Sequence, residues 1–130
     1  MIALDSSALV KLVLDEPESP ALETWLSARL PLTVTASDLV RVEVIRAVAR
    51  TGPAGVPRAR ALLAGVDLVP LSPDLLEVAA DLAPPSLRSL DAVHLATALN
   101  LGSALDAFVV YDERLAQAAT DAGLPVVTPS

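Results

Sequence analysis

The sequence predicts an α/β fold, a three-layer α/β/α sandwich around a mostly parallel sheet of four or five strands. Short apolar segments alternate with longer amphipathic segments along the whole chain, and Pro or Gly interrupts the chain between them. Hydrophobic residues make up 53% of the chain but aromatic residues only 2%, so the core has to consist of Ala, Leu and Val. Because there is no repeat, linker or low-complexity segment, we expect a single domain over residues 1–130.

The expected strands are short and apolar. The first comprises residues 2–4 and is ended abruptly by Asp5, and the others follow after helical segments. The β-branched and apolar runs that predict them span residues 32–36, 66–70, 107–110 and, as an edge strand, 124–127.

The expected helices show apolar residues at spacings of three and four, with recognisable starts and stops. Two Ser-Pro pairs, at Ser19 and Ser72, join a capping residue to proline at the first helical position, and Gly102 and Gly123 end helices. After a first helix that begins near Ser6, the helices are expected at residues 20–29, from 37–38 to about 50, and at 56–64, 74–82, 90–101 and 112–122. The helix at 90–101 is apolar on nearly every side, which predicts a buried central helix.

Composition and charge exclude several classes of protein. The chain has no cysteine, which rules out a disulfide framework and a thiolate metal site. Its net charge of −7 argues against a generic nucleic-acid binder. The first residues lack the pattern of a signal peptide, and the longest apolar stretch without formal charge, residues 92–105, is too short to span a bilayer. We therefore expect a cytoplasmic protein that does not bind membranes.

Four acids do not fit the polar helix faces and loops on which the other acids are expected. Asp5 ends the first strand and Asp112 follows the fourth, and ligands bind at the carboxyl ends of strands in open α/β sheets. Glu43 lies within a helix among apolar residues, and Asp91 starts the most apolar helix. Converging carboxylates repel one another and would destabilise the fold unless a cation is bound, and Mg²⁺ prefers oxygen ligands. The alternative is that Asp5 or Ser6 only caps the next helix.

Four segments resemble the signature blocks of PIN-domain ribonucleases. They are LDSSALVK at 4–11, SDLVRVE at 37–43, LDAVHLATA at 90–98 and VYDERL at 110–115. With the length of the chain, they look most like the VapC toxins of bacterial toxin–antitoxin pairs, and the resemblance covers about residues 2–128. It implies an endoribonuclease that depends on Mg²⁺ or Mn²⁺, is inhibited by a small VapB-like antitoxin, and commonly forms a homodimer. The catalytic, metal-binding acids of the family match Asp5, Glu43, Asp91 and Asp112 in this sequence.

The same resemblance assigns a supporting role to the hydroxyl groups after the first strand. A family hydroxyl that helps to order the site matches Ser7, with Ser6 beside it. One position departs from the pattern: the family often has Ser or Thr two residues before its last acid, where this chain has Val110. That departure removes a polar contact near the metal and puts the strength of a second metal site in doubt.

The remaining candidates have simpler interpretations. His94 shares a helix face with Asp91, and we expect a hydrogen-bonded core histidine rather than a catalytic group. Residues 41–60 contain five Arg and one acid, so this stretch carries +4 and the rest of the chain −11. Arg46 and Arg50 share a helix face with Glu43, which makes them candidates for contacts to RNA phosphates. The alternative is a solvated helix face without a partner.

Two other functions stay open. A catalytically silent PIN-like module that binds RNA or protein would be compatible with Val110. An aspartate-nucleophile phosphatase is also an α/β protein with an acid after its first strand, but its Asp-x-Asp-x-Thr motif requires a second Asp where this chain has Ser7. RNA cleavage, acyl-phosphate formation and metal binding together distinguish the three functions.

Overall fold

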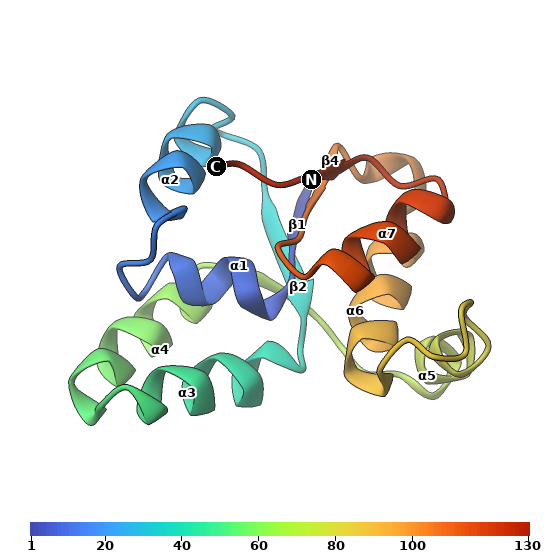
Figure 1. The fold of residues 1–130 in the computed structure, drawn as a ribbon, viewed down its shortest axis with the longest axis horizontal. Coiled ribbons are helices and arrows are strands. Elements are labelled where there is room, and N and C mark those ends of the chain that lie inside the picture. The colour runs from blue at the N-terminus through green and yellow to red at the C-terminus, as the bar shows by residue number, and fades with distance from the viewer.

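The computed structural model describes residues 1–130, and its centre is a sheet of five parallel strands in the order β3-β2-β1-β4-β5 (Figure 1). The strands are β1 (Ile2–Leu4), β2 (Val34–Ser37), β3 (Asp67–Val69), β4 (Ala107–Val109) and β5 (Val126–Val127). In the register of the sheet, Leu4 of β1 lies opposite Val109 of β4. Because every pair is parallel, all carboxyl ends lie at one edge of the sheet, and the expected edge strand is confirmed.

Seven α-helices connect the strands and cover both faces of the sheet. On one side lie α1 (Ser6–Lys11), α2 (Ser19–Ser27), α3 (Val40–Arg50) and α4 (Val56–Ala64). On the other side lie α5 (Pro73–Ala80), α6 (Ser89–Asn100) and α7 (Glu113–Asp121) (Figure 1). None of these helices has the length and apolar character needed to cross a membrane. The predicted three-layer α/β/α sandwich is confirmed.

Apolar side chains attach the helices to both faces of the sheet. Successive residues of a strand point to opposite faces, so β1 contributes to both layers. Ile2 and Leu4 belong to the layer under α1–α4, whereas Ala3 belongs to the layer under α6 and α7. Phe108, the only phenylalanine, is fully buried in the second layer. The central strand is thus buried on both sides, which makes the charge directly after it unusual.

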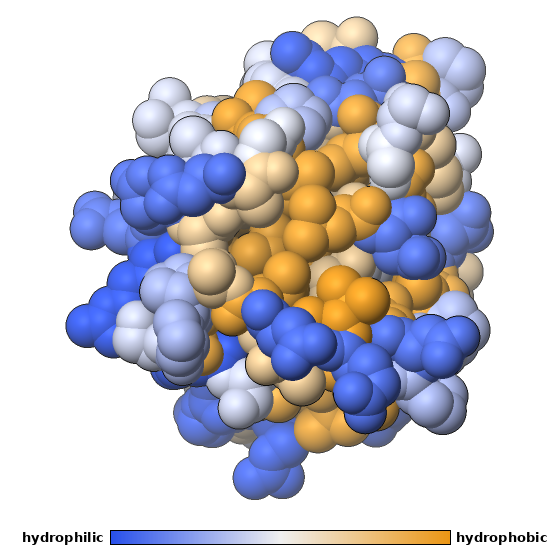
Figure 2. Space-filling model, turned by 90° about the vertical axis from the view of Figure 1, so that its right-hand side faces the viewer, coloured by the Kyte–Doolittle hydropathy of each residue, from blue (hydrophilic) through white to orange (hydrophobic).

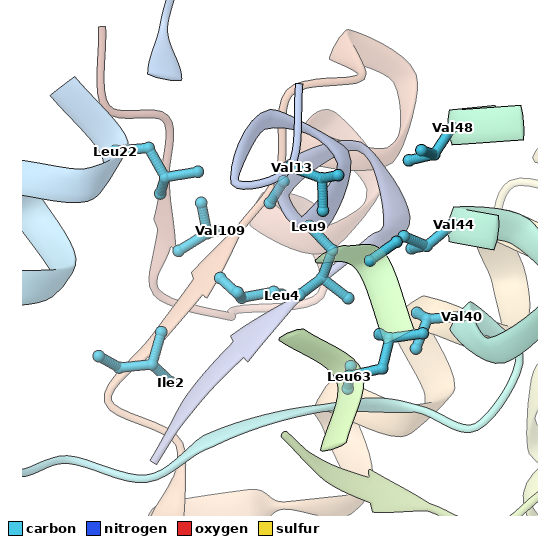
Figure 3. Packing of buried hydrophobic residues seen from close by; sticks show 13 residues of the cluster. Ile2, Leu4, Leu9, Val13, Leu22, Val40, Val44, Val48, Leu63 and Val109 are labelled. Atoms are coloured by element: carbon cyan, nitrogen blue, oxygen red, sulfur yellow. The ribbon is translucent and has the colours of Figure 1, made fainter. Parts of the chain in front are cut away.

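A row of valines fixes α3 against α1 and the sheet. Val40, Val44 and Val48 are four residues apart, lie on one helix face and are completely buried. Figure 3 shows their side chains pointing from α3 toward Leu9 of α1 and the strands. Glu43 precedes Val44 by one residue, so its carboxylate lies at the margin of this buried row and not on the solvent face.

The buried central helix that the composition predicts is α6. Residues 92–98 are all buried, between the sheet on one side and α5 and α7 on the others. Gly102 follows the last turn with φ of +54°, a conformation that costs glycine little because it has no Cβ. Asp91 lies in the first turn of α6 and His94 one turn later, so this rigid helix holds both polar groups in place.

Two expected helix starts are displaced, and one is confirmed. Ser37 is the last residue of β2 rather than the start of a helix, and α3 begins only at Val40. Ser19 is the first residue of α2 and not its N-cap, because its hydroxyl binds backbone groups of the preceding turn. Ser72 caps α5 as expected by accepting a hydrogen bond from the N–H of Leu75. The Ser-Pro pair therefore marks a helix start correctly but does not by itself identify the capping group.

Candidate active site

The four acids singled out in the sequence come from four different elements around the carboxyl edge of the sheet. Asp5 directly follows β1, and Asp112 is the N-cap of α7 after β4. Glu43 and Asp91 lie in the first turns of α3 and α6. Hydrogen bonds and ion pairs connect these acids to neighbouring side chains, and each acid has a distinct environment.

Asp5 is the most buried of the four acids, with 4% of its surface exposed, and it caps α1. Its Oδ1 atom accepts hydrogen bonds from the Ser7 hydroxyl at 2.7 Å and from the Ala8 N–H at 3.0 Å. The pKa of Asp5 is raised, and the main cause is burial. The hydrogen bonds from Ser7 and Ala8 and the charge of His94 lower this pKa, but by less than burial raises it. Oδ2 accepts no hydrogen bond and is not fully buried, since every fully buried side-chain oxygen has a partner. Asp5 therefore caps a helix and still offers one free oxygen.

Glu43 is bound by Ser6 and His94, which come from α1 and α6. Its Oε1 atom accepts hydrogen bonds from the Ser6 hydroxyl at 2.5 Å and from His94 Nε2 at 2.6 Å. The Ser6 oxygen and His94 Nε2 are also 3.2 Å apart. Because an ionised carboxylate can only accept hydrogen bonds, Nε2 of His94 carries the hydrogen. Burial raises the pKa of Glu43, but the hydrogen bonds from His94 and Ser6, together with the charges of His94 and Arg88, hold this pKa below its ordinary value.

The environment of His94 is only partly the one that the sequence predicts. The side chain is 3% exposed, so the expectation of a buried, hydrogen-bonded histidine is confirmed. Its partner, however, is the carboxylate of Glu43, so His94 belongs to the polar cluster and not only to the core. The available signal was its position one turn after Asp91 in a helix that is otherwise apolar on this side.

Arg88 connects the other two acids, and sequence reasoning did not single it out. Its Nε atom donates to Asp91 Oδ2 at 2.9 Å, and its Nη2 atom donates to Asp112 Oδ2 at 3.3 Å. The other oxygen of Asp112 accepts from the N–H of Leu115 and caps α7. The signal that could have found Arg88 is its position three residues before Asp91, a spacing at which opposite charges meet on a helix.

The oxygen atoms of this cluster suit a hard divalent cation. Carboxylates are the ligands that Mg²⁺ and Mn²⁺ prefer, and Asp5 has a free oxygen. As the side chains stand, no three acid or imidazole groups are close enough together to hold one ion. Arg88 and His94 instead supply positive charge or hydrogen bonds to Asp91, Asp112 and Glu43. These partners offset part of the repulsion expected among the three acids, and Asp91 adds to the raised pKa of Asp5, to which burial contributes most.

The remaining sequence candidates lie outside the hydrogen-bonded cluster. Arg46 and Arg50 are exposed on α3, the helix that carries Glu43. Val110 is completely buried in the apolar layer under α6 and α7. The position where the resemblance leads us to expect a hydroxyl is thus part of the core, and Asp112 has no hydroxyl neighbour there.

Comparison with known proteins identifies the family. The PIN domain family model matches residues 2–121 of the chain. The chain belongs to the PIN-domain family. Ribonuclease VapC47 of Mycobacterium tuberculosis is 45% identical over 132 residues, which cover 99% of this chain and 97% of the relative. Ribonuclease VapC46 of the same organism is 44% identical over 129 residues, covering 99% and 98%. These full-length matches place this PIN domain among the VapC proteins.

Solved structures of other proteins share the fold. VapC20 of Mycobacterium tuberculosis, described as a Sarcin-Ricin loop cleaving toxin, superposes with a TM-score of 0.79 at 20% identity, covering 99% of this chain and 100% of that chain. A chain of a toxin–antitoxin complex from Klebsiella pneumoniae superposes with a TM-score of 0.74 at 24% identity, covering 100% and 98%. At these identities the likeness concerns the fold.

Proposed function

We propose that this chain, as one PIN domain over residues 1–130, is a metal-dependent endoribonuclease that hydrolyses RNA phosphodiester bonds and is the toxin of a toxin–antitoxin pair. The observation that carries the proposal is that four carboxylates from four elements lie around the carboxyl edge of the sheet. The full-length similarity to proteins named ribonuclease VapC supports the reaction class.

Each residue of the cluster has a role in this proposal. Asp5, Asp91, Asp112 and Glu43 would hold Mg²⁺ or Mn²⁺, which activates water and stabilises the leaving oxygen of a phosphodiester when it is bound. Ser7 holds one oxygen of Asp5 and leaves the other free. Ser6 and His94 fix the carboxylate of Glu43, and its lowered pKa keeps it ionised at neutral pH.

The proposal includes two protein partners and a location. A small VapB-like antitoxin would inhibit the toxin in the cytoplasm, and chains of similar fold do occur in toxin–antitoxin complexes. The second protein partner is another copy of this chain, with which it would form a homodimer. Its support is the apolar surface on the face that α5–α7 form (Figure 2), where Leu76, Val78 and Leu90 are exposed.

The test is RNA cleavage by the purified chain with and without divalent metal. Cleavage is expected with Mg²⁺ or Mn²⁺, should stop with excess EDTA, and should return when metal is restored. Sequencing of RNA 5′ ends shortly after induction in cells would then identify the substrate. A catalytically silent module, which the buried Val110 favours, predicts binding of RNA or protein without new 5′ ends, and a phosphatase predicts an acyl-phosphate; either result contradicts the proposal.

The double variant Arg46→Ala/Arg50→Ala is expected to bind RNA more weakly and with a lower salt dependence. For each phosphate that the variant no longer binds, the slope of log K against log salt should fall by about 0.7 to 0.9. Thermal stability should change little, because both side chains are exposed on α3. Binding of a non-cleavable RNA, measured by fluorescence anisotropy from low to moderate salt, checks this prediction.

Arg29→Ala is the matched control for the arginine pair. Arg29 follows α2 near the amino end of β2, far from the acidic cluster along the strands, and its guanidinium lies over the ring of Trp25. Its removal should leave the salt slope unchanged. If the double variant also keeps the slope of the unaltered protein, Arg46 and Arg50 do not contact phosphate.

A further inference from the structure

Arg88 places a positive charge where helix geometry disfavours one. It is the N-cap of α6, but its side chain makes no capping hydrogen bond. Ser, Asn and Asp are preferred at this position, and the partial positive charge of a helix N-terminus repels a cation. Stabilisation of α6 therefore does not explain why an arginine stands at position 88. What holds its guanidinium is the pair of carboxylates, Asp91 and Asp112.

The guanidinium binds oxygen atoms of both acids that a metal ion could otherwise use. Oδ1 of Asp112 accepts a hydrogen bond from the N–H of Leu115, so Oδ2 is the oxygen without a backbone partner, and Arg88 Nη2 binds that atom. On Asp91, Arg88 likewise binds Oδ2. Since arginine does not deprotonate in proteins, its positive charge leaves these oxygens only if the side chain moves.

Arg88 is free enough to move. Its side chain is 67% exposed, and ion pairs of such exposed groups contribute little to stability. A surface pocket lined by Tyr111, Asp112, Glu113 and Arg114 also contains Arg88 and gives its long side chain space to rotate. The contacts of Arg88 are thus specific in their geometry but weak enough to be exchanged.

We propose that Arg88 is an internal counter-ion of the site and that a divalent cation binds by displacing its guanidinium from Asp91 and Asp112. This inference rests on the proposed function, because it takes these two acids as metal ligands. In the metal-free protein Arg88 neutralises part of the charge of Asp91 and Asp112. It is a positioning residue that lowers the affinity of the site for metal.

The first experiment compares Mn²⁺ binding to the unaltered protein and to Arg88→Gln by isothermal titration calorimetry. Removal of the competing cation is expected to tighten Mn²⁺ binding by about fivefold to tenfold. Arg114→Gln is the matched control, because Arg114 lines the same pocket and carries the same charge but forms no ion pair with an acid of the site. The Mn²⁺ affinity of Arg114→Gln should stay within about twofold of the unaltered protein, because this variant removes only a distant positive charge.

The second experiment observes the displacement itself. In the ¹⁵N-detected arginine spectrum, the Nε–Hε signal of Arg88 is identified by its absence in Arg88→Gln or Arg88→Lys. During a titration with Mg²⁺ this signal is expected to shift in parallel with saturation of the site, while the Arg114 signal stays in place. The measurement needs no altered side chain in the titrated protein, so it remains decisive if Arg88→Gln is unstable.

The outcomes separate this inference from the proposed function. Unchanged or weaker Mn²⁺ binding by Arg88→Gln overturns the inference, and so does an Arg88 signal that stays in place at saturating Mg²⁺. If the unaltered protein binds neither Mn²⁺ nor Mg²⁺ at millimolar concentrations, the metal-dependent function itself is wrong and the inference falls with it. Tighter binding by the variant together with a moving Arg88 signal supports both.

Discussion

Asp5→Asn is expected to lower metal-dependent RNA cleavage at least about a hundredfold without unfolding the protein. The amide keeps the shape of the side chain, and its oxygen can still accept the hydrogen bonds that Ser7 and Ala8 donate to Asp5. The negative charge that would attract a metal ion is removed. Asp91→Asn should have a similar effect. Initial rates of cleavage of a fluorescent RNA at fixed Mn²⁺, with circular dichroism as the test of folding, check the prediction.

Helix α7 offers a matched pair of acids for the same assay. Asp112 caps its first turn and belongs to the cluster, whereas Asp121 ends the helix, is exposed and accepts a hydrogen bond from Gln117. Asp112→Asn should reduce cleavage strongly, and Asp121→Asn should not. The nuclease site would be refuted if Asp5→Asn and Asp91→Asn both retained cleavage and bound Mn²⁺ as tightly as the unaltered protein.

Asp5→Asn and Glu43→Gln are expected to change the metal-free stability at pH 7 in opposite directions. Burial disfavours the charged form of Asp5, so the neutral amide should raise the melting temperature. Glu43 is different, because the hydrogen bonds from Ser6 and His94 favour its charged form. Replacing that carboxylate weakens both bonds, and we expect a loss of about 1–3 kcal/mol in the free energy of unfolding.

The contributions of the Asp5 and Glu43 carboxyl groups to stability should depend on pH in opposite ways. The pKa of Asp5 in the folded protein lies above 3.8, so its contribution to stability is complete below pH 3.8 and is lost as pH rises through the folded pKa. The pKa of Glu43 in the folded protein lies below 4.5, so its contribution is present above pH 4.5 and is lost as pH falls through the folded pKa. The gain in stability of Asp5→Asn and the loss in stability of Glu43→Gln, each relative to the unaltered protein, should therefore be largest at pH 7 and become smaller in acid.

Thermal melting without metal, followed by circular dichroism between about pH 3 and pH 8, tests this pair of signs. The two variants serve as controls for each other, since each removes one carboxylate charge from the same edge of the sheet. Shifts of the same sign at pH 7 would show that the environment of one of the two acids is wrongly described.

The sequence predicts the fold and the position of two of the acids because these depend on local pattern. Alternation of apolar and amphipathic segments identifies every strand, and an acid immediately after a strand, as at Asp5, has to lie at the carboxyl edge of a parallel sheet. Ser37 shows the limit of such reasoning. Strand and helix starts are both compatible with Ser-Asp, and pairing with β3 decides in favour of the strand.

The electrostatic partners of the acids are not predictable in the same way. His94 meets Glu43 across 51 residues of sequence, and Arg88 meets Asp112 across 24. Both contacts arise from the way in which separate helices pack, which no periodicity encodes. The sequence therefore reveals which carboxylates stand out, but not that three of them are already paired within the protein.

The order of strands in the sheet affects when the protein becomes active during its own synthesis. Strand β1, the first strand of this sequence, lies in the middle of the sheet and pairs with β4, which comes more than a hundred residues later. A nascent chain of a hundred residues lacks that strand and also lacks Asp112. Its acidic edge is incomplete, so the four acids can come together only after the segment with β4 and Asp112 has been synthesised.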